Sequence, residues 1–336
     1  MNQILIIIRE DNNNIVFDVR LIDSLKNETK VVADSTFFMK TYDIENFENN
    51  QFFISQSNVL AHKINEFIDT HNYTKSKMIL CLDSFCFLEK INLPKSALKN
   101  TSNNIDQEMI NNYKINYDKK YVLSKSISPI LDNNMYQATI LMIRRNIYQR
   151  LLYISSLIKG KLVEVEYYSD VVLSHLLSEK KMDKTSNFLA VFVDQSGFSH
   201  VLSYIDRSLA SSSYYHLNNE EIKTWESSIA GALEESASAK RFKDKKVVPL
   251  KVSKGFYDLF LPIIKEIEKN CAFFYNYEIP TLFLNALSID TEFFDLCFEK
   301  KFPEIKVERT SMDISSLLIK KTKTFFTLPL KVKNVK

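Results

Sequence analysis

Glycine is scarce in this sequence. Only Gly160, Gly197, Gly231 and Gly255 occur among 336 residues, whereas an average usage of about 7% would give roughly 20. Backbone can approach a phosphate closely only where no side chain stands in the way, so loops that bind phosphate usually contain glycine. The scarcity argues against a glycine-rich nucleotide loop, and the sequence contains neither a Walker loop nor a Gly-x-Ser-x-Gly elbow.

Cysteine is also rare. The four cysteines, Cys81, Cys86, Cys271 and Cys297, are too few and too widely spaced for a disulfide framework, and none forms a Cys-x-x-Cys pair. Free cysteines are usually buried, so we expect reduced thiols that bind no metal. A His-Glu-x-x-His helix and an EF-hand loop are missing as well, which leaves no common metal-binding motif.

Strong charge and long apolar runs are both missing. The formal net charge is +3, with basic and acidic residues mixed along the chain, so no basic field attracts nucleic acid. The longest apolar stretches, such as residues 4–8, are far below the roughly 18 residues that a membrane span needs. The first residues lack the basic region and cleavage site of a signal peptide. We therefore expect a cytoplasmic protein that does not bind nucleic acid.

The order of elements in the first part of the chain recurs in the second. Apolar alternation and turn residues predict three strands, a helix and a further strand, in that order. In the first part these elements are residues 3–9, 15–22, 30–39, 55–71 and 78–82. In the second part they are residues 188–194, 198–205, 209–216, 219–242 and 247–252. The recurrence predicts an internal duplication with two similar lobes.

A different unit lies between the two repeats. Its pattern predicts a strand, a helix and two strands, followed by a helix that leads back to the first lobe. These elements are residues 85–93, 95–113, 121–128, 135–144 and 146–158. After the second repeat, the pattern predicts alternating helices and strands at residues 256–274, 280–284, 291–300, 305–308 and 312–321. We therefore expect an inserted subdomain in the first lobe.

Short phrases within this order carry a resemblance to a known family. They are Leu82-Asp83-Ser84-Phe85, Ile91-Asn92-Leu93-Pro94 and Phe192-Val193-Asp194-Gln195-Ser196-Gly197. With the element order, they resemble the PilM family of type IV pilus and type II secretion assembly proteins, which is related to FtsA. The resemblance implies an α/β, actin-like fold, which is a duplicated ribonuclease H-like fold of two lobes with an inserted strand-helix-strand-strand subdomain. We expect the first lobe at residues 1–83 and 166–186, the insert at 84–165 and the second lobe at 187–336.

The resemblance also implies a function. Such a protein is a cytoplasmic scaffold at the inner membrane, and it docks the cytoplasmic tail of a PilN-like inner-membrane partner. It links the membrane platform to a cytoplasmic motor ATPase, and it can form oligomers. Machines for type IV pili, type II secretion and DNA uptake use similar parts, so the sequence is compatible with all three.

Actin-like ATPases bind nucleotide with two Asp-x-Gly turns on the phosphates and a Gly-Gly turn near the adenosine. The resemblance places the second phosphate turn at Asp194, Gln195, Ser196, Gly197 and Ser199. The acidic group would face Mg²⁺ and the small residues would face phosphate. An alternative interpretation is a tight polar hairpin that needs only a positive φ at Gly197.

The other two turns lack glycine. Where the first Asp-x-Gly turn is expected, the chain has Arg9, Glu10 and residues 11–14, and where the Gly-Gly turn is expected it has Asn285 and Ala286. Asn can adopt the left-handed conformation, but its Cβ crowds a phosphate. We therefore expect a pseudo-ATPase with no catalytic residue, no metal and no cofactor. The alternatives are an ATP–Mg²⁺ switch that controls partner binding and a sugar-kinase-like enzyme, which would need a catalytic Asp in the cleft.

Three further features have ordinary structural interpretations. His200 is the one histidine near an acidic strand end, at Asp194, and we expect it to be structural, because proton transfer needs an oriented partner. The basic runs at residues 240–246 and 320–323 read as solvated helix ends, although they suit an acidic lipid or partner. The apolar tail at residues 325–330 is expected to pack onto the fold.

Overall fold

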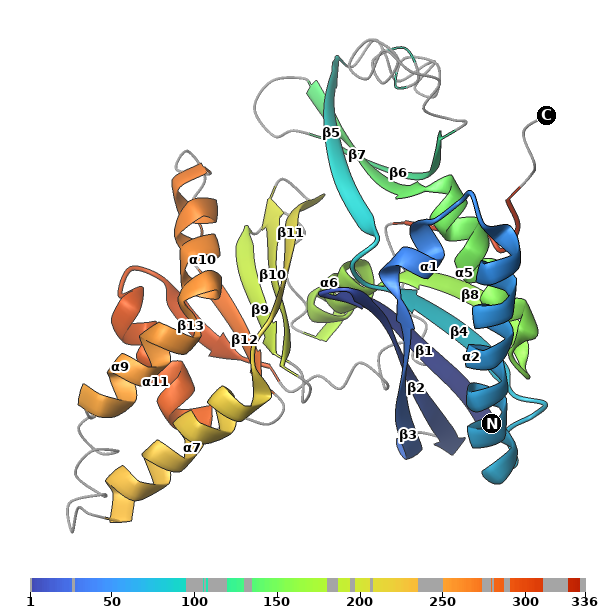
Figure 1. Ribbon diagram of the computed structural model, residues 1–336. Helices are drawn as coiled ribbons and strands as arrows, with labels where there is room; N and C mark the ends of the chain where they lie inside the picture. Colours follow the sequence, from blue (N-terminus) through green and yellow to red (C-terminus); the bar gives the residue numbers. More distant parts are fainter. Residues whose placement is uncertain are drawn as a thin grey trace. The chain divides into compact units, whose positions relative to one another are not determined.

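The computed structural model describes most of the chain, in two compact units. The described residues are 2–25, 28–94, 105, 107, 120–129, 135–179, 187–193, 197–205, 208–234, 250–273, 279, 281–286, 291–310 and 326–332. The first unit consists of Met1–Met182 and Ile314–Lys336, and the second is Asp183–Asp313. Figure 1 shows their elements.

The first unit is built on a five-stranded mixed sheet. In sheet order the strands are β3 (Glu28–Lys40), β2 (Asn14–Leu25), β1 (Asn2–Asp11), β4 (Lys77–Leu82) and β8 (Lys161–Tyr167). The pairs β3–β2 and β2–β1 are antiparallel, whereas β1–β4 and β4–β8 are parallel. Residues 4–8 of β1 are all buried, as expected for a central strand covered on both faces. The edge strand β3 instead alternates and exposes Val32 and Phe38.

Helices α1 (Thr41–Glu45), α2 (Asn50–Thr70) and α5 (Arg145–Leu157) belong to the same unit. Helix α2 begins earlier than the predicted residue 55, because the Asn49 side chain caps it by accepting the N–H of Phe52 at 3.0 Å. Helices α2 and α5 pack side by side (Figure 1), and the Asn65 side chain donates to the carbonyl of Leu157 at 2.9 Å.

The insert is a small antiparallel sheet. Its strands are β5 (Cys86–Pro94), β7 (Met135–Arg144) and β6 (Tyr121–Pro129), in that order. Ile105 is helical and packs on the sheet with Ile91, Leu93, Ile140 and other apolar side chains. The predicted helix at residues 95–113 otherwise lies outside the described residues.

The insert is shorter than the predicted range of residues 84–165. Strand β8 pairs with β4, and α5 packs on α2, so both elements belong to the first lobe. Strand β8 was not predicted, because Glu164 and Glu166 interrupt its apolar pattern. Charged residues are tolerated there because β8 lies at the edge of the sheet.

The second unit repeats the sheet of the first. In sheet order its strands are β11 (Ser208–His216), β10 (Phe198–Ile205), β9 (Phe188–Val193), β12 (Thr281–Ala286) and β13 (Lys306–Arg309). The pairs β11–β10 and β10–β9 are antiparallel, and β9–β12 and β12–β13 are parallel. Order and directions match the first sheet strand for strand. The predicted duplication is therefore confirmed.

Helices α7 (Asn219–Glu234), α9 (Leu250–Leu259), α10 (Leu261–Phe273) and α11 (Thr291–Lys301) complete the second unit. A strand was predicted at residues 247–252, but residues 250–252 begin α9, where the carbonyl of Val252 accepts the Trp225 indole N–H at 2.9 Å. The single helix predicted at residues 256–274 is two helices that meet at Phe260. Pro262 stands in the first turn of α10, where proline is tolerated.

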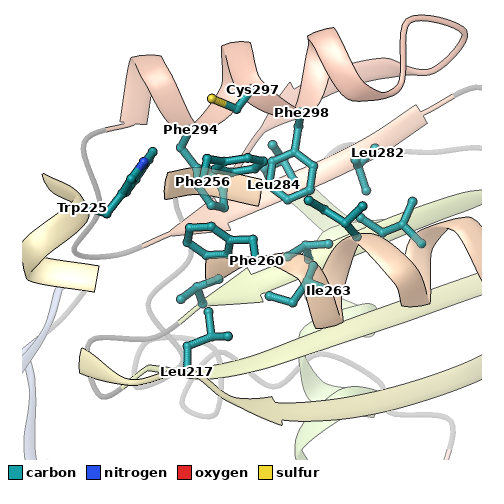
Figure 2. Packing of buried hydrophobic residues seen from close by; sticks show 14 of the residues in the cluster. Leu217, Trp225, Phe256, Phe260, Ile263, Leu282, Leu284, Phe294, Cys297 and Phe298 are labelled. Atoms are coloured by element: carbon teal, nitrogen blue, oxygen red, sulfur yellow. The ribbon is translucent and has the colours of Figure 1, made fainter. Parts of the chain in front are cut away.

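Aromatic rings fill the core of the second unit. Figure 2 shows Trp225, Phe256, Phe260, Phe294 and Phe298 packed together, with Leu282 and Leu284 of β12 beside them. The rings of Phe256 and Phe298 meet edge to face with centroids 5.0 Å apart, a favoured arrangement for aromatic pairs. Because the chain has one tryptophan, Trp225 is a fluorescent reporter of this unit alone.

The described C-terminal segment, residues 326–332, packs in the first unit, although the second lobe was predicted to extend to residue 336. Phe326 and Leu328 are 3% and 5% exposed, so these two residues pack onto the fold as predicted. The helix predicted at residues 312–321 lies outside the described residues.

Candidate functional site

The predicted phosphate turn connects β9 and β10. Asp194, Gln195 and Ser196 lie outside the described residues, so only Gly197 and Ser199 are placed. Gly197 has a φ of +81°, which L side chains rarely adopt. The carbonyl of Gly197 accepts the N–H of Leu217 at 2.9 Å. A Cβ on Gly197 would lie 2.3 Å from the carbonyl oxygen of Leu217. The close approach of the segment after β11 therefore requires a glycine here whether or not a ligand binds.

Ser199 is fully buried. Its hydroxyl donates to the carbonyl of Gly197 at 3.2 Å, so the side chain contributes to the internal structure of the hairpin. Both described members of the predicted turn thus have a structural role. Their binding of phosphate stays a prediction.

The corresponding end of the first sheet contains a buried ion pair. Arg9, in β1, and Asp83, directly after β4, are 1% and 4% exposed, and Arg9 Nε donates to Asp83 Oδ2 at 2.9 Å. The guanidinium also lies over the ring of Tyr168, 5.5 Å from its centroid. Arg9 thus places a buried cation directly before the expected first phosphate turn, and the carboxylate of Asp83 balances its charge.

The β1–β2 turn beyond Arg9 is polar and acidic. Asn12 has a φ of +53°, so asparagine takes the left-handed position that glycine often occupies. The N–H of Glu10 donates to the Ser84 hydroxyl at 2.5 Å. Burial raises the pKa of Glu10, the negative charge of Glu45 raises it further, and Arg144 opposes both effects. Carboxyl groups in this turn disfavour a phosphate anion.

The third expected contact, near the adenosine, is described only at its start. Asn285 is 4% exposed at the end of β12, and Ala286 is the last residue of that strand. Residues 287–290 lie outside the described residues. No glycine occurs at residues 285–290, so the backbone there has no position free of a side chain.

The cysteines and His200 are buried or partly buried. The four cysteines are free, as predicted. Burial raises the pKa of Cys81 well above its ordinary value and raises that of Cys297 to about 12, so neither forms a thiolate at neutral pH. His200 is 1% exposed and lies 5.4 Å from the ring of Tyr214. Within the described ranges, no three His, Cys, Asp or Glu side chains form a metal-binding group.

Residues 326–332, which we call the tail segment, contact three separate elements of the first unit. The N–H of Phe326 donates to Asp170 Oδ2 of α6 (Tyr168–Glu179) at 2.7 Å. The N–H of Thr327 donates to the hydroxyl of Ser124 in β6 at 2.9 Å. The Tyr148 hydroxyl of α5 donates to the carbonyl of Pro329 at 2.7 Å.

Side-chain burial completes this arrangement. Phe326 meets the ring of Tyr167 edge to face at 6.5 Å. Leu328 is buried, whereas the side chains of Thr327 and Pro329, on either side of it, are exposed. We call Ser124, Tyr148, Tyr167 and Asp170 together the tail site. No local sequence pattern predicts this site, because its hydrogen bonds join residues 156 to 203 positions apart.

A second surface feature lies between the α1–α2 connection and α5. It is an open pocket of about 360 Å³ lined by Phe47, Phe53, Arg150, Tyr153 and neighbouring residues. The Arg150 guanidinium lies over the Phe47 and Phe53 rings at 4.7 and 4.2 Å, and it donates to the backbone carbonyls of Asp43 and Ile44. Arg150 therefore fixes α1 against α5.

No protein-family model matches the chain, and no curated protein matches it. Solved structures do. One chain of a PilM-PilN type IV pilus biogenesis complex is 12% identical with a TM-score of 0.56, over 90% of this chain and 87% of that chain. The cytoplasmic domain of EpsL, an inner-membrane component of the type II secretion system of Vibrio cholerae, is 12% identical with a TM-score of 0.46, over 97% and 98%. A Bacteroides thetaiotaomicron protein of actin-like ATPase fold and unknown function is 12% identical with a TM-score of 0.41, over 95% and 96%.

The likeness to the PilM-PilN chain concerns the fold. Together with the two sheets of identical strand order, it shows an actin-like fold of two lobes with an inserted subdomain in the first. The fold class expected from the sequence is therefore confirmed. In the part of the chain that the structure describes, no helix is long and apolar enough to cross a membrane.

Proposed function

We propose that this protein is a cytoplasmic scaffold of a type IV pilus, type II secretion or DNA-uptake machine, and that its first unit docks the cytoplasmic tail of an inner-membrane partner. The similar structure of a PilM-PilN complex supports this proposal at the level of the fold. A shared fold does not define a function, so the proposed docking has to be supported by a particular site on this chain.

The tail site is the observation that carries the proposal. It holds a chain segment outside any helix or strand through two N–H groups and one carbonyl, and the side chains of Phe326 and Leu328 are buried. Backbone groups are common to every peptide, so such a site suits a flexible tail from another protein. The arrangement needs no glycine and no nucleotide.

We further propose that the protein does not hydrolyse ATP. The buried pair of Arg9 and Asp83 stands where the first phosphate turn is expected, and Gly197 is required by internal packing. Calorimetry with ATP and Mg²⁺ decides between this proposal and an ATP-driven switch. We expect no binding at micromolar ATP. Micromolar affinity that is lost in Asp194→Ala would favour the switch.

The docking function is tested with synthetic peptides that tile the cytoplasmic tails of single-span inner-membrane proteins from the same genome. We expect at least one peptide to bind with a Kd in the micromolar range. Asp170→Asn is tested in a chain that also carries Phe326→Ala/Leu328→Ala, because the chain's own segment uses the same acceptor. There we expect Asp170→Asn to weaken peptide binding about tenfold, because a charged acceptor is lost. Thr327→Ala, which changes only an exposed side chain, is the matched control. If no peptide binds, or if Asp170→Asn leaves every affinity unchanged, docking at this site is wrong.

A further inference from the structure

We propose that the tail segment is a built-in competitor that occupies the tail site in cis and has to leave before a partner peptide can bind there. This inference rests on the proposed docking function, and it adds a way in which the chain itself regulates the binding of the partner peptide. Figure 1 shows the segment, in red, beside α5. Its occupancy of the site is direct, because Phe326, Thr327 and Pro329 each form a hydrogen bond to it.

The chemistry of the site does not distinguish its own tail from another peptide. Asp170 and Ser124 accept backbone N–H groups, and the Tyr148 hydroxyl donates to a backbone carbonyl. Any peptide in the same conformation offers these groups. Selectivity comes from the two buried side chains, an aromatic at the position of Phe326 and an aliphatic residue two positions later, at Leu328. We infer that the partner peptide carries the same spacing.

Few buried side chains hold the segment, so another peptide can displace it. Only Phe326 and Leu328 are buried, whereas Thr327, Pro329, Leu330 and Lys331 are exposed. Tethering compensates for a small contact, because a linked segment acts at an effective concentration of about 1 mM. For an intrinsic Kd of about 10–100 µM, the tethered segment raises the apparent Kd of a competing peptide by roughly 10–100-fold.

The test uses the full chain and a fluorescein-labelled synthetic peptide with the sequence of residues 326–332. Wild type should bind this peptide weakly, because the site is already filled. Phe326→Ala/Leu328→Ala removes both anchors, and we expect it to bind the peptide at least tenfold more tightly. The matched control, Thr327→Ala/Leu330→Ala, changes exposed side chains and should bind as weakly as wild type. Equal affinity in wild type and the anchor variant would overturn the proposal.

A second measurement keeps the test decisive if the anchor variant does not fold. Saturating unlabelled peptide is added to wild type, and hydrogen exchange is followed at the amides of Phe326 and Thr327. Displacement should speed their exchange about tenfold, because both N–H groups lose their acceptors. Unchanged exchange at a peptide concentration of several millimolar would mean that the segment is a fixed part of the fold, and the proposal would be wrong.

Failure of this inference can be told apart from failure of the docking function. If the tail peptide binds the anchor variant but no membrane-protein peptide does, the site is real and the proposed function is wrong. If a membrane-protein peptide binds wild type and the anchor variant with equal affinity, docking stands and the competition is wrong.

Discussion

The two units share one strand order but differ at the turn between their first two strands. In the second unit the β9–β10 turn keeps Gly197, whose absent side chain leaves room for the carbonyl of Leu217. In the first unit the β1–β2 turn has asparagines at residues 12–14. The buried ion pair of Arg9 and Asp83 lies next to this turn, at the ends of β1 and β4. A glycine in such a turn can therefore be required by neighbouring backbone, and its presence alone does not indicate a bound ligand.

The difference has a physical cause. A turn position whose own Cβ meets no neighbouring backbone can hold asparagine in place of glycine at small cost, since asparagine tolerates a positive φ. Asn12 has a φ of +53°, and its side chain donates to the adjacent side chain of Asp11. The turn contacts neighbouring backbone one residue later, where the carbonyl of Asn13 accepts the N–H of Thr41 at 2.9 Å. Gly197 has no such freedom, because any Cβ meets backbone at 2.3 Å. The glycine retained in the predicted phosphate turn is therefore explained without a nucleotide.

The largest effect that we expect comes from breaking the ion pair of the first unit. Asp83→Ala leaves the guanidinium of Arg9 buried without this carboxylate, which should lower the free energy of unfolding of that unit by about 3–5 kcal/mol. The measurement is urea unfolding followed by far-UV circular dichroism, with Trp225 fluorescence as the reporter of the second unit. If the units unfold independently, the fluorescence transition stays in place.

A double variant tests the cause of that loss. Arg9→Met/Asp83→Leu replaces the pair with apolar side chains and should recover most of the lost stability. If it is as unstable as Asp83→Ala, the loss arises from packing and the role given to charge is wrong.

The second prediction exchanges the left-handed residues of the two turns. Gly197→Asn should destabilise the second unit by about 3 kcal/mol, because strain at a positive φ adds to the clash with the carbonyl of Leu217. Asn12→Gly is the matched control and should change stability by less than about 0.5 kcal/mol. Trp225 fluorescence during urea unfolding measures the first variant, and circular dichroism measures the second. Equal effects would remove the contrast drawn between the two turns.

The smallest effect concerns Glu266, a buried carboxylate of the second unit whose ion-pair partner, Lys269, lies 3.4 Å away and has an exposed side chain. Burial of Glu266 acts to raise its pKa, but hydrogen bonds from Ser213 and Tyr215 and the charge of Lys269 bring the pKa below its usual value of 4.5. A lowered pKa stabilises the fold above about pH 4.5. This stabilisation should disappear as the pH falls through the folded-state pKa.

Glu266→Gln measures that contribution. At pH 7 the variant should be less stable than wild type by about 1 kcal/mol, because hydrogen bonds to a charged acceptor are lost. The difference should shrink as the pH falls below about 4.5 and the carboxylate becomes protonated. Trp225 fluorescence in urea over a series of pH values gives the comparison, and a difference that does not shrink with falling pH would contradict the assignment to charge.

Much of the fold follows from local sequence patterns. The apolar residues 4–8 predict a strand, and the hairpin interpretation of residues 194–199 predicts a positive φ at Gly197. The structure agrees on both. The repeated element order predicts the duplication. Local patterns failed at β8, whose Glu164 and Glu166 mask a strand, and at residues 250–252, where an apolar run is a helix end rather than a strand.

Most helices and strands follow from the order of the amino acids, because backbone propensity and the period of apolar residues are local properties. Only the tertiary structure decided which distant groups meet. Arg9 and Asp83 are 74 positions apart, and Phe326 and Asp170 are 156 apart. Their contacts depend on which elements lie next to each other in the fold, and no local pattern carries that information. The ion pair, the crowding at Gly197 and the tail site could therefore be read only from the structure.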